Sequence, residues 1–286
     1  MAIPAAAVKE LREKTGAGMM DCQRALQEAG GDMEAAVTIL RKKGLSAAAK
    51  KASRTAKDGL VSIAVIEEGR RAGMVELNCE TDFVARTEQY QAFAQALADQ
   101  VAADGAVDVE KVKATRYVGD PLHTVAEAIG AQIATIGENI VLSRVGFLAA
   151  GDGMQIGSYL HMGGKIGVLV ELSAAADEAT VKDVAMQVAA AEPRWVAPGD
   201  VPPEVVDQER EIAKAQAATS GKPAQVIEKI ADGKVGKYYE VVCLVEQPFV
   251  KDPAKKVSAV LSERGGVTAR RFLRFKLGEG VAAAEK

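Results

Sequence analysis

An internal repeat dominates this sequence and indicates its fold class. Residues 61–77 align without a gap onto residues 156–172. Each copy runs on into an alanine-rich helical pattern, and the strand pattern at 140–148 returns at 267–275, followed each time by Gly-acid-Gly. A segment that recurs in this way marks one structural unit used twice. The sequence therefore predicts an α+β fold of two related subdomains, each with a small antiparallel sheet backed by helices.

The first copy shows the two periods that distinguish strands from helices. Apolar residues alternate along 60–66 and 72–79 around a turn at 67–71, which predicts a β-hairpin. The predicted elements that follow are helices at 87–103, 108–115 and 121–136, and a strand at 139–148.

The second copy is longer because it carries an insertion. Helical spacing begins after Asp200, and a second helix follows through 226–231 after a turn at 220–223. Two antiparallel helices with one narrow apolar seam predict a protruding helical hairpin. The chain is then predicted to return as an apolar strand at 238–247.

Residues 4–57 are predicted to form a small module of three helices. The first follows Pro4, the second begins near Met19, and the third is capped by Asp32 and ended by Gly44. The two adjacent methionines that open the second helix either form an adaptable apolar contact surface or close the core of the module.

Charge is unevenly divided along the chain. Residues 1–57 hold 11 Lys and Arg against 6 Asp and Glu, a balance of +5, whereas the remainder holds 25 against 33, a balance of −8. A basic segment of this kind contacts nucleic acid or an acidic protein surface, or is a solvated linker. Residues 47–57 are predicted to be a helical or flexible connector. RNA binding by residues 41–57 is therefore one alternative for the function.

Composition is typical of a globular protein of a reducing compartment. The chain has 286 residues, 48% hydrophobic and 26% charged, which suffices for a sizeable core and more than one domain. Cys22, Cys79 and Cys243 have no Cys-x-x-Cys partner, so neither a zinc site nor a disulfide framework is predicted. No secretory signal is visible, and no apolar run reaches the ~18 residues that span a bilayer. We expect a cytoplasmic protein without a membrane partner.

The connection at 80–86 has an unusual composition for a short loop between a strand and a helix. Its sequence is ETDFVAR, so an acid, a large aromatic and a base stand where Gly, Ser or Asn is common. Thr81 and Asp82 suit a helix start, where a side-chain oxygen accepts a free backbone N–H. Phe83 either caps the core or is an aromatic anchor aimed at a partner, with Asp82 and Arg86 as polar contacts around it. The local sequence slightly favours the anchor, and periodicity does not decide.

The glycine-rich and titratable motifs do not assemble into a catalytic constellation. Gly151, Gly153 and Gly157 are followed by a strand, which leaves no helix N-terminus for a pyrophosphate. The sequence GGK at 163–165 lacks the Ser or Thr that a phosphate loop needs for magnesium. His161 has neither a nucleophile in a recognisable elbow nor metal-binding spacing around it. We therefore expect no enzyme activity, no cofactor and no metal site.

Five motifs resemble those of the bacterial elongation factor Ts family. They are VKELREKTGAGMMDC at 8–22, NCETDFVAR at 78–86, HMGGKIGVL at 161–169, LVEQPFVKD at 244–252 and RFLRFKLGEG at 271–280. The resemblance covers essentially the whole chain in the family's order, and the motifs together are highly specific.

The resemblance implies a domain organisation that agrees with the pattern analysis. It implies a UBA-like helical module with a basic linker at 1–57, a core subdomain at 58–153, and a second core subdomain at 154–280 with a coiled-coil hairpin at about 200–236. Residues 281–286 are left as a short tail. Some family members continue into a further helix that touches the partner, and here such a contact would have to come from this tail.

The resemblance also implies a function, which is guanine-nucleotide exchange on elongation factor Tu during translation. The partner would be Tu in its GDP-bound and nucleotide-free forms, and no nucleic acid is expected. In the family, a Thr-Asp-Phe-Val stretch enters the nucleotide domain of the partner and disturbs its magnesium site. By position that role falls on Thr81, Asp82, Phe83 and Val84.

Further contacts are implied for two other segments. The N-terminal module of the family docks on the same domain of the partner, which points to Arg12, Met19 and Met20. The turn that contains His161 and Gly164 would face another domain of the partner.

Overall fold

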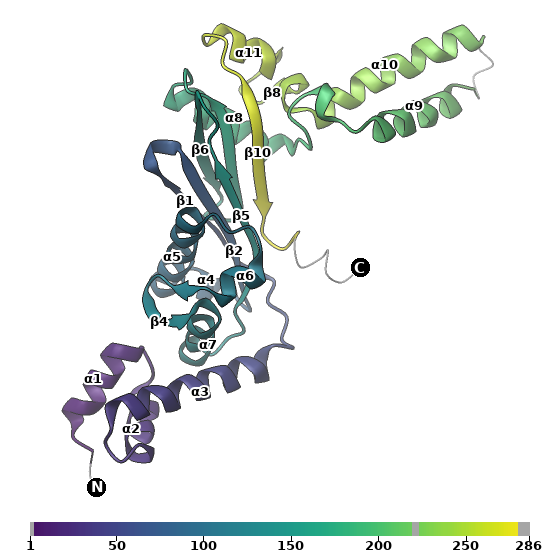
Figure 1. Cartoon of the computed structure of the whole chain (residues 1–286). Helices are drawn as coiled ribbons and strands as arrows, with labels where there is room; N and C mark the ends of the chain where they lie inside the picture. The colour runs from purple at the N-terminus through teal and green to yellow at the C-terminus, as the bar shows by residue number, and fades with distance from the viewer. Residues whose placement is uncertain (1–2, 219–222, 280–286) are drawn as a thin grey trace.

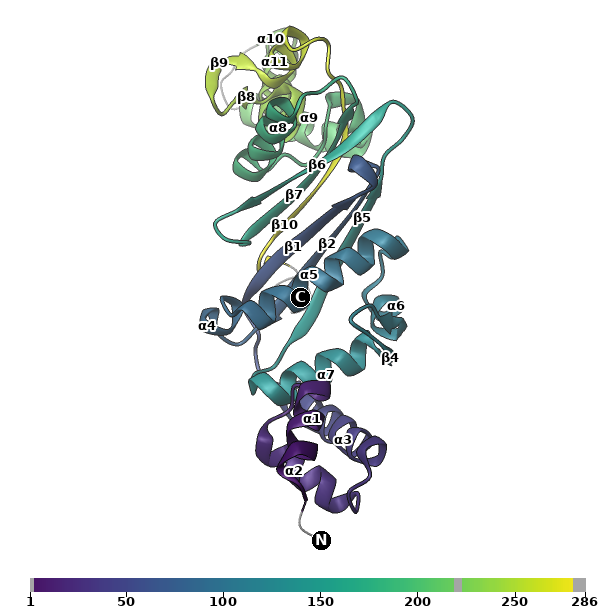
Figure 2. The same ribbon diagram turned by 90° about the vertical axis from the view of Figure 1, so that its left-hand side faces the viewer.

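A computed structural model describes residues 3–218 and 223–279, and within these residues the predicted α+β fold is confirmed. Two three-stranded antiparallel sheets form its centre (Figures 1 and 2). The first sheet orders β1 (Asp58–Ile66), β2 (Arg71–Cys79) and β5 (Val141–Ala149), and the second orders β6 (Met154–His161), β7 (Ile166–Ser173) and β10 (Ala269–Lys276). The same strand order in both sheets confirms the repeat.

The two sheets pack against each other through their inner faces. One apolar cluster joins Val61 and Met74 of the first sheet to Ile156 and Leu169 of the second. Gly167 allows the close approach, because a Cβ there would lie 2.4 Å from Cγ1 of Val61. A larger residue at this position would push the sheets apart.

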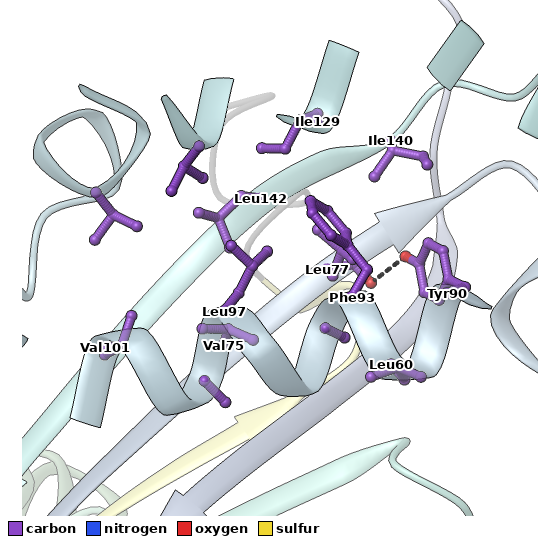
Figure 3. Close-up of a cluster of buried hydrophobic side chains, with 14 of the residues drawn as sticks. Leu60, Val75, Leu77, Tyr90, Phe93, Leu97, Val101, Ile129, Ile140 and Leu142 are labelled. Atoms are coloured by element: carbon purple, nitrogen blue, oxygen red, sulfur yellow. Dashed lines mark hydrogen bonds between the residues drawn. The ribbon is translucent and has the colours of Figure 1, made fainter. Parts of the chain in front are cut away.

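A helix covers the outer face of each sheet. On the first sheet lies α5 (Glu88–Asp104), and on the second lies α8 (Glu178–Ala191). Phe93 and Leu97 of α5 point onto the sheet beside Leu142, and Ile129 of α7 (Val125–Ile136) completes this core (Figure 3). The first subdomain therefore has a core of its own on the side away from the second sheet.

Buried glutamates join the two copies reciprocally. Glu76 on β2 is fully buried, and its carboxylate accepts a hydrogen bond from Nε of Arg144 at 2.5 Å and one from the N–H of Gly278 at 2.8 Å. Arg144 also donates to the carbonyl of Lys276 at 2.7 Å. The central strand of the first sheet is thereby bonded to the end of the second copy.

The second copy returns the same contact. Glu171 on β7 is fully buried and accepts hydrogen bonds from Arg271 and from the N–H of Gly151. Arg271 also donates to the carbonyl of Ala149, at 2.6 Å. Burial alone would raise the pKa of Glu171, but the Gly151 N–H and the Arg271 guanidinium outweigh it and hold that pKa below its ordinary value of 4.5. We refer to these two contacts, Glu76 with Arg144 and Glu171 with Arg271, as the reciprocal clamps.

Both copies contain a small hairpin that the sequence patterns did not predict. In the first it is β3 (Arg116–Tyr117) with β4 (Asp120–Thr124), between α6 (Val109–Ala114) and α7. In the second it is β8 (Pro248–Phe249) with β9 (Asp252–Lys256), before α11 (Val257–Glu263). The predicted helix at 121–136 therefore starts too early. It begins at Val125 because Thr124 and Glu127 form a capping box there.

The N-terminal module contains the three predicted helices, α1 (Ala5–Thr15), α2 (Met19–Glu28) and α3 (Met33–Lys51). The prediction that Gly44 ends the third helix is wrong, since α3 continues for two more turns. Gly44 is buried where α3 crosses α7, and a Cβ on it would lie 3.3 Å from the carbonyl oxygen of Gly130. The glycine thus permits a close contact between helices instead of a helix stop, and the connector at 47–57 is helical as far as Lys51.

The insertion is a projecting pair of helices, α9 (Pro203–Ala218) and α10 (Ala224–Val242) (Figure 1). The predicted strand at 238–247 is wrong, because α10 runs on to Val242 and the short helix η3 (Leu244–Glu246) follows. Tyr238, Tyr239 and Val242 extend the helical seam onto Trp195, so tertiary packing outweighs the strand propensity of this run. Most of the predicted turn at 220–223 lies outside the described residues.

Two further short 3-10 helices lie in connections between larger elements. They are η1 (Glu67–Gly69), in the predicted turn between β1 and β2, and η2 (Pro198–Asp200), before the hairpin. The predicted tail at 281–286 lies outside the described residues. Among the helices within the described ranges, none combines the length and apolar character needed to cross a bilayer.

Candidate functional site

The turn between β2 and α5 forms a single helical turn, α4 (Asp82–Ala85). Thr81 is its N-cap, and its hydroxyl oxygen accepts the N–H of Val84 at 3.4 Å, as the sequence predicted. Phe83 is 79% exposed, which excludes the interpretation that it caps the core. Figure 2 shows α4 at an outer edge of the molecule. The turn therefore presents a large aromatic ring to solvent.

The residues on either side of Phe83 hold the turn in place. Ala85 is buried and Val84 is partly buried against the core of the first subdomain. Asp82 pairs with Arg86 at 2.7 Å, so the two residues predicted as polar contacts around the ring bond to each other in the isolated chain. The structure thus brings Thr81, Asp82, Phe83 and Val84 together, and of these four only Phe83 is exposed rather than partly buried.

Hydrogen bonds at the end of β2 support the turn from below. Tyr90 is buried and donates its hydroxyl to the carbonyl of Leu77 at 2.8 Å (Figure 3). Burial raises the pKa of Tyr90 and that of the Cys79 thiol, so both groups keep their protons at neutral pH. Cys79 Sγ lies 3.1 Å from the carbonyl oxygen of Thr81, to which it donates. These bonds fix the strand end from which α4 departs.

A carboxylate from a distant part of the chain completes the support. Glu138, between α7 and β5, accepts hydrogen bonds from the N–H of Glu80 at 3.1 Å, the N–H of Thr81 at 3.0 Å and the hydroxyl of Thr81 at 2.7 Å. In return, Glu80 accepts the N–H of Asn139 at 2.7 Å. Sequence reasoning missed Glu138, because an acid in a Gly-Glu-Asn turn has no pattern that separates it from a solvated charge.

The turn between β6 and β7 lies close to this site. Gly164 is buried, and its carbonyl accepts the N–H of Val61 on β1 at 2.7 Å. A Cβ on Gly164 would lie 3.2 Å from Cβ of Leu60, whose side chain packs in the same core cluster as Ala85. The start of β1 therefore lies between the Phe83 turn and the β6–β7 turn.

The exposed groups of the β6–β7 turn differ from the predicted pair. His161 is exposed, and its Nδ1 lies 3.0 Å from the hydroxyl of Tyr159. Gly164 is buried and so has no exposed surface for a partner, whereas Met162, two positions earlier, is 72% exposed. Met162 was not singled out from the sequence, although an apolar residue at a hairpin turn is a usable signal.

The remaining predicted residues lie on the N-terminal module, away from the Phe83 turn. Arg12 is exposed on α1, and Met19 and Met20, at the start of α2, are exposed by 44% and 65%. The core of this module is formed by other residues, Leu11 and Leu26 among them. Of the two interpretations of the methionine pair, the structure therefore supports the surface one.

The basic segment at 41–57 is largely engaged inside the molecule. Arg41 pairs with Glu127 of α7, Lys43 with Glu28, Lys51 with the carbonyl of Ile133, and Arg54 with Glu80. Much of this segment belongs to α3, which docks on the core. Four of its seven basic side chains therefore have partners within the chain, and three of these partners lie on the core, which weakens the RNA-binding alternative.

A cavity of about 680 Å³ lies between the N-terminal module and the core. Its lining includes Val37 and Leu40 of α3 and Leu122 and His123 of β4. None of residues 81–86 and 161–165 lines it. The exposed aromatic turn and this cavity are thus separate features.

Fold and site together define a class of protein, an α+β chain built from two copies of one subdomain that presents an aromatic ring on a firmly held turn. Comparison with known proteins identifies the family. The model of the family described as elongation factor TS matches residues 80–279. The chain therefore belongs to the elongation factor Ts family, and its role is that of a translation elongation factor.

Individual relatives agree with this assignment over nearly the full length. The chain is 47% identical to elongation factor Ts of Thioalkalivibrio sulfidiphilus, across 98% of this chain and 94% of the relative. It is 45% identical to that of Trichlorobacter lovleyi, across 100% and 96%, and 44% identical to that of Clostridium perfringens, across 99% and 96%. The resemblance of the five sequence motifs is thus confirmed.

Proposed function

We propose that this chain is a guanine-nucleotide exchange factor for elongation factor Tu. It binds Tu with GDP, disturbs the magnesium site of Tu, releases GDP and is displaced by GTP. The observation that carries the proposal is Phe83, 79% exposed on a turn whose backbone is hydrogen-bonded by Glu138 and Cys79. An exposed aromatic side chain held in one place is the typical anchor of a protein interface.

Nucleotide exchange requires this chain to make or break no covalent bond, and we propose no such step. The factor must bind nucleotide-free Tu more tightly than GDP-bound Tu. Because coupling between two ligands is reciprocal, the factor weakens GDP by the same ratio by which GDP weakens the factor. The free energy gained from the Phe83 contact in nucleotide-free Tu therefore drives GDP release.

In this proposal the Phe83 ring acts as a wedge that disturbs the partner's metal ion. A ring inserted beside the helices that support the magnesium and phosphate ligands displaces them, and loss of the ion removes the main charge that neutralises the phosphates. In this chain Thr81 and Val84 hold the turn from the inside, Phe83 enters the partner, and Asp82 makes polar contacts at the rim. GTP, in excess, then binds the open site and expels the factor.

Two further surfaces contribute affinity in this proposal. Arg12, Met19 and Met20 dock on the nucleotide domain of Tu, and the β6–β7 turn with His161 and Met162 faces another domain. All five of these side chains are exposed, which supports their use as contacts. The factor acts in the cytoplasm and uses neither nucleic acid nor membrane.

The test is release of fluorescent GDP from purified Tu with and without this protein. The wild-type chain is expected to accelerate release, and Phe83→Ala to slow the stimulated rate at least ~10-fold, on the scale of a truncated hot spot. Leu122→Ala is the matched control, since Leu122 is 76% exposed on the same subdomain. Near-normal exchange by Phe83→Ala, or an equal loss in both variants, would refute the wedge.

A further inference from the structure

The contact between Glu138 and the Phe83 turn is the feature of this molecule that the proposed function leaves unused. Glu138 follows Gly137, the left-handed C-cap of α7 at φ +90°. One carboxylate oxygen accepts both the N–H of Glu80 and the N–H of Thr81, and the other accepts the hydroxyl of Thr81. A single side chain thus binds three donors at the base of α4.

This contact reaches Phe83 through an unbroken series of bonds. Glu138 holds Thr81, the Thr81 hydroxyl oxygen caps α4 by accepting the N–H of Val84, and Phe83 lies between these two residues. Among the described residues, the hydrogen bonds that Glu138 accepts come from Glu80 and Thr81 and not from Phe83. Its effect on the ring is therefore to restrict the backbone that carries it.

Neighbouring bonds keep Glu138 itself in place. Asn139 donates its backbone N–H to Glu80 at 2.7 Å and its side-chain amide to the carbonyl of Arg54 at 2.8 Å. Arg54 in turn lies 3.5 Å from the carboxylate of Glu80. The turn after α7 and the turn after β2 are thereby joined from both sides, so Glu138 has a fixed position from which to act.

The described residues of the second copy show no counterpart of this contact. The strand correspondence of 140–148 with 267–275 places Gly265 where the first copy has Glu138. There the strand end is closed by Ser173 and Thr268, which exchange backbone and side-chain hydrogen bonds. The anchored carboxylate occurs in the copy that bears Phe83 and is replaced by glycine in the other.

We propose that Glu138 is a positioning residue for nucleotide exchange, which fixes the backbone of Glu80 and Thr81 so that Phe83 enters the partner without first having to be ordered. This inference rests on the proposed exchange function. Ordering a free residue has a large entropic cost, and a turn that is already ordered avoids it at the moment of insertion. The geometry of the carboxylate, and not its charge, carries the effect.

Two conservative variants separate geometry from charge. Glu138→Gln keeps the length and one acceptor oxygen that can take both N–H groups, so its maximal stimulated rate of GDP release is expected within roughly threefold of wild type. Glu138→Asp keeps the charge but is one methylene too short to reach Thr81. We expect it to lower that rate by roughly 5- to 30-fold, as for one residue left unordered.

The readout is the stimulated rate against factor concentration, measured together with hydrogen exchange of the Glu80 and Thr81 amides. A positioning role lowers the maximal rate and removes the protection of these amides, while the half-saturating concentration stays within roughly twofold, because the other contact surfaces are intact. Asp177→Ala is the control. Asp177 caps α8 in the second copy, so its removal also takes away a side-chain bond that stabilises the fold, but it leaves residues 80–86 untouched.

Two results would overturn the inference. The first is a near-wild-type maximal rate of GDP release with Glu138→Asp and a reduced rate with Glu138→Gln, which would show that the charge matters. The second is a wild-type maximal rate in a variant whose Glu80 and Thr81 amides have lost protection. If Glu138→Asp fails to fold, a slow Glu138→Gln alone still overturns it. If wild-type protein does not accelerate GDP release at all, the proposed function fails, and the amide protection still reports whether Glu138 holds the turn.

Discussion

The two copies of the repeat are alike where they hold each other and different where each sheet leads into its helix. Both have a buried glutamate on the central strand, paired with an arginine on the last strand, and each arginine reaches a carbonyl of the other copy. After β2, however, the chain forms α4 with Phe83, whereas after β7 it enters α8 directly. The shared contacts build the scaffold, and the unshared turn is the place to look for function.

The largest expected effect on stability tests the reciprocal clamps, which both copies share. Replacing Arg144 by Met leaves Glu76 buried without its cation, which should lower the free energy of unfolding by about 3–5 kcal/mol. Replacing Arg271 by Met should cost less, about 1–3 kcal/mol, because Arg270 still lies 3.7 Å from Glu171. Urea denaturation of both variants measures the difference.

An exposed ion pair provides the control for this comparison. Lys255 and Glu263 are paired at 2.7 Å on the surface of the second copy, so Lys255→Met should leave the urea midpoint of unfolding close to that of wild type. Losses of similar size in Lys255→Met and Arg144→Met would mean that the reciprocal clamps do not hold the copies together.

A smaller effect depends on pH. Because the pKa of Glu171 is held below 4.5 in the folded state, its contribution to stability is present above that value and is lost as pH falls through the lower, folded pKa. Glu171→Gln should be about 1–2 kcal/mol less stable than wild type at pH 7, since it loses the charge-assisted bonds. The gap should narrow below pH 4.5, where the wild-type carboxylate takes up its proton.

Thermal or urea unfolding at a series of pH values checks this sign. A gap between the two proteins that widens on acidification would mean that the Glu171 carboxylate is destabilising in the fold, and that this clamp is not a stabilising feature that the copies share.

The scaffold was largely predictable from the sequence because its signals are local. Alternating apolar residues gave β1 and β2, and the recurrence of 61–77 at 156–172 predicted the second hairpin. The errors lie where long-range packing decides. Gly44 reads as a helix stop, but it is the point at which α3 approaches Gly130. The tyrosines of α10 have strand propensity, but they pack on Trp195 as part of a helix.

The candidate site was predictable only in part. The composition of 80–86 indicated an anchored turn, and the cap by Thr81 could be read from residue types alone. Glu138 could not, because it lies 57 positions from Thr81 and nothing local marks it. The small hairpins at β3–β4 and β8–β9 could have been found, since YVGDP at 117–121 and FVKDP at 249–253 are a second trace of the repeat.

The smallest expected effect is an unchanged rate of GDP release, and it tests the α4 turn, which only the first copy has. By the alignment of the repeats, Glu178 at the start of α8 corresponds to Phe83, and it is exposed. Glu178→Phe adds a second exposed ring at the matching corner, but with Gly265 in the place of Glu138 and a full helix in place of the α4 turn. We expect no gain in stimulated GDP release, and we expect Phe83→Ala combined with Glu178→Phe to be as slow as Phe83→Ala alone. Recovery in the double variant would mean that any exposed ring at such a corner suffices, because the turn and its anchor would then add nothing that the scaffold does not already provide.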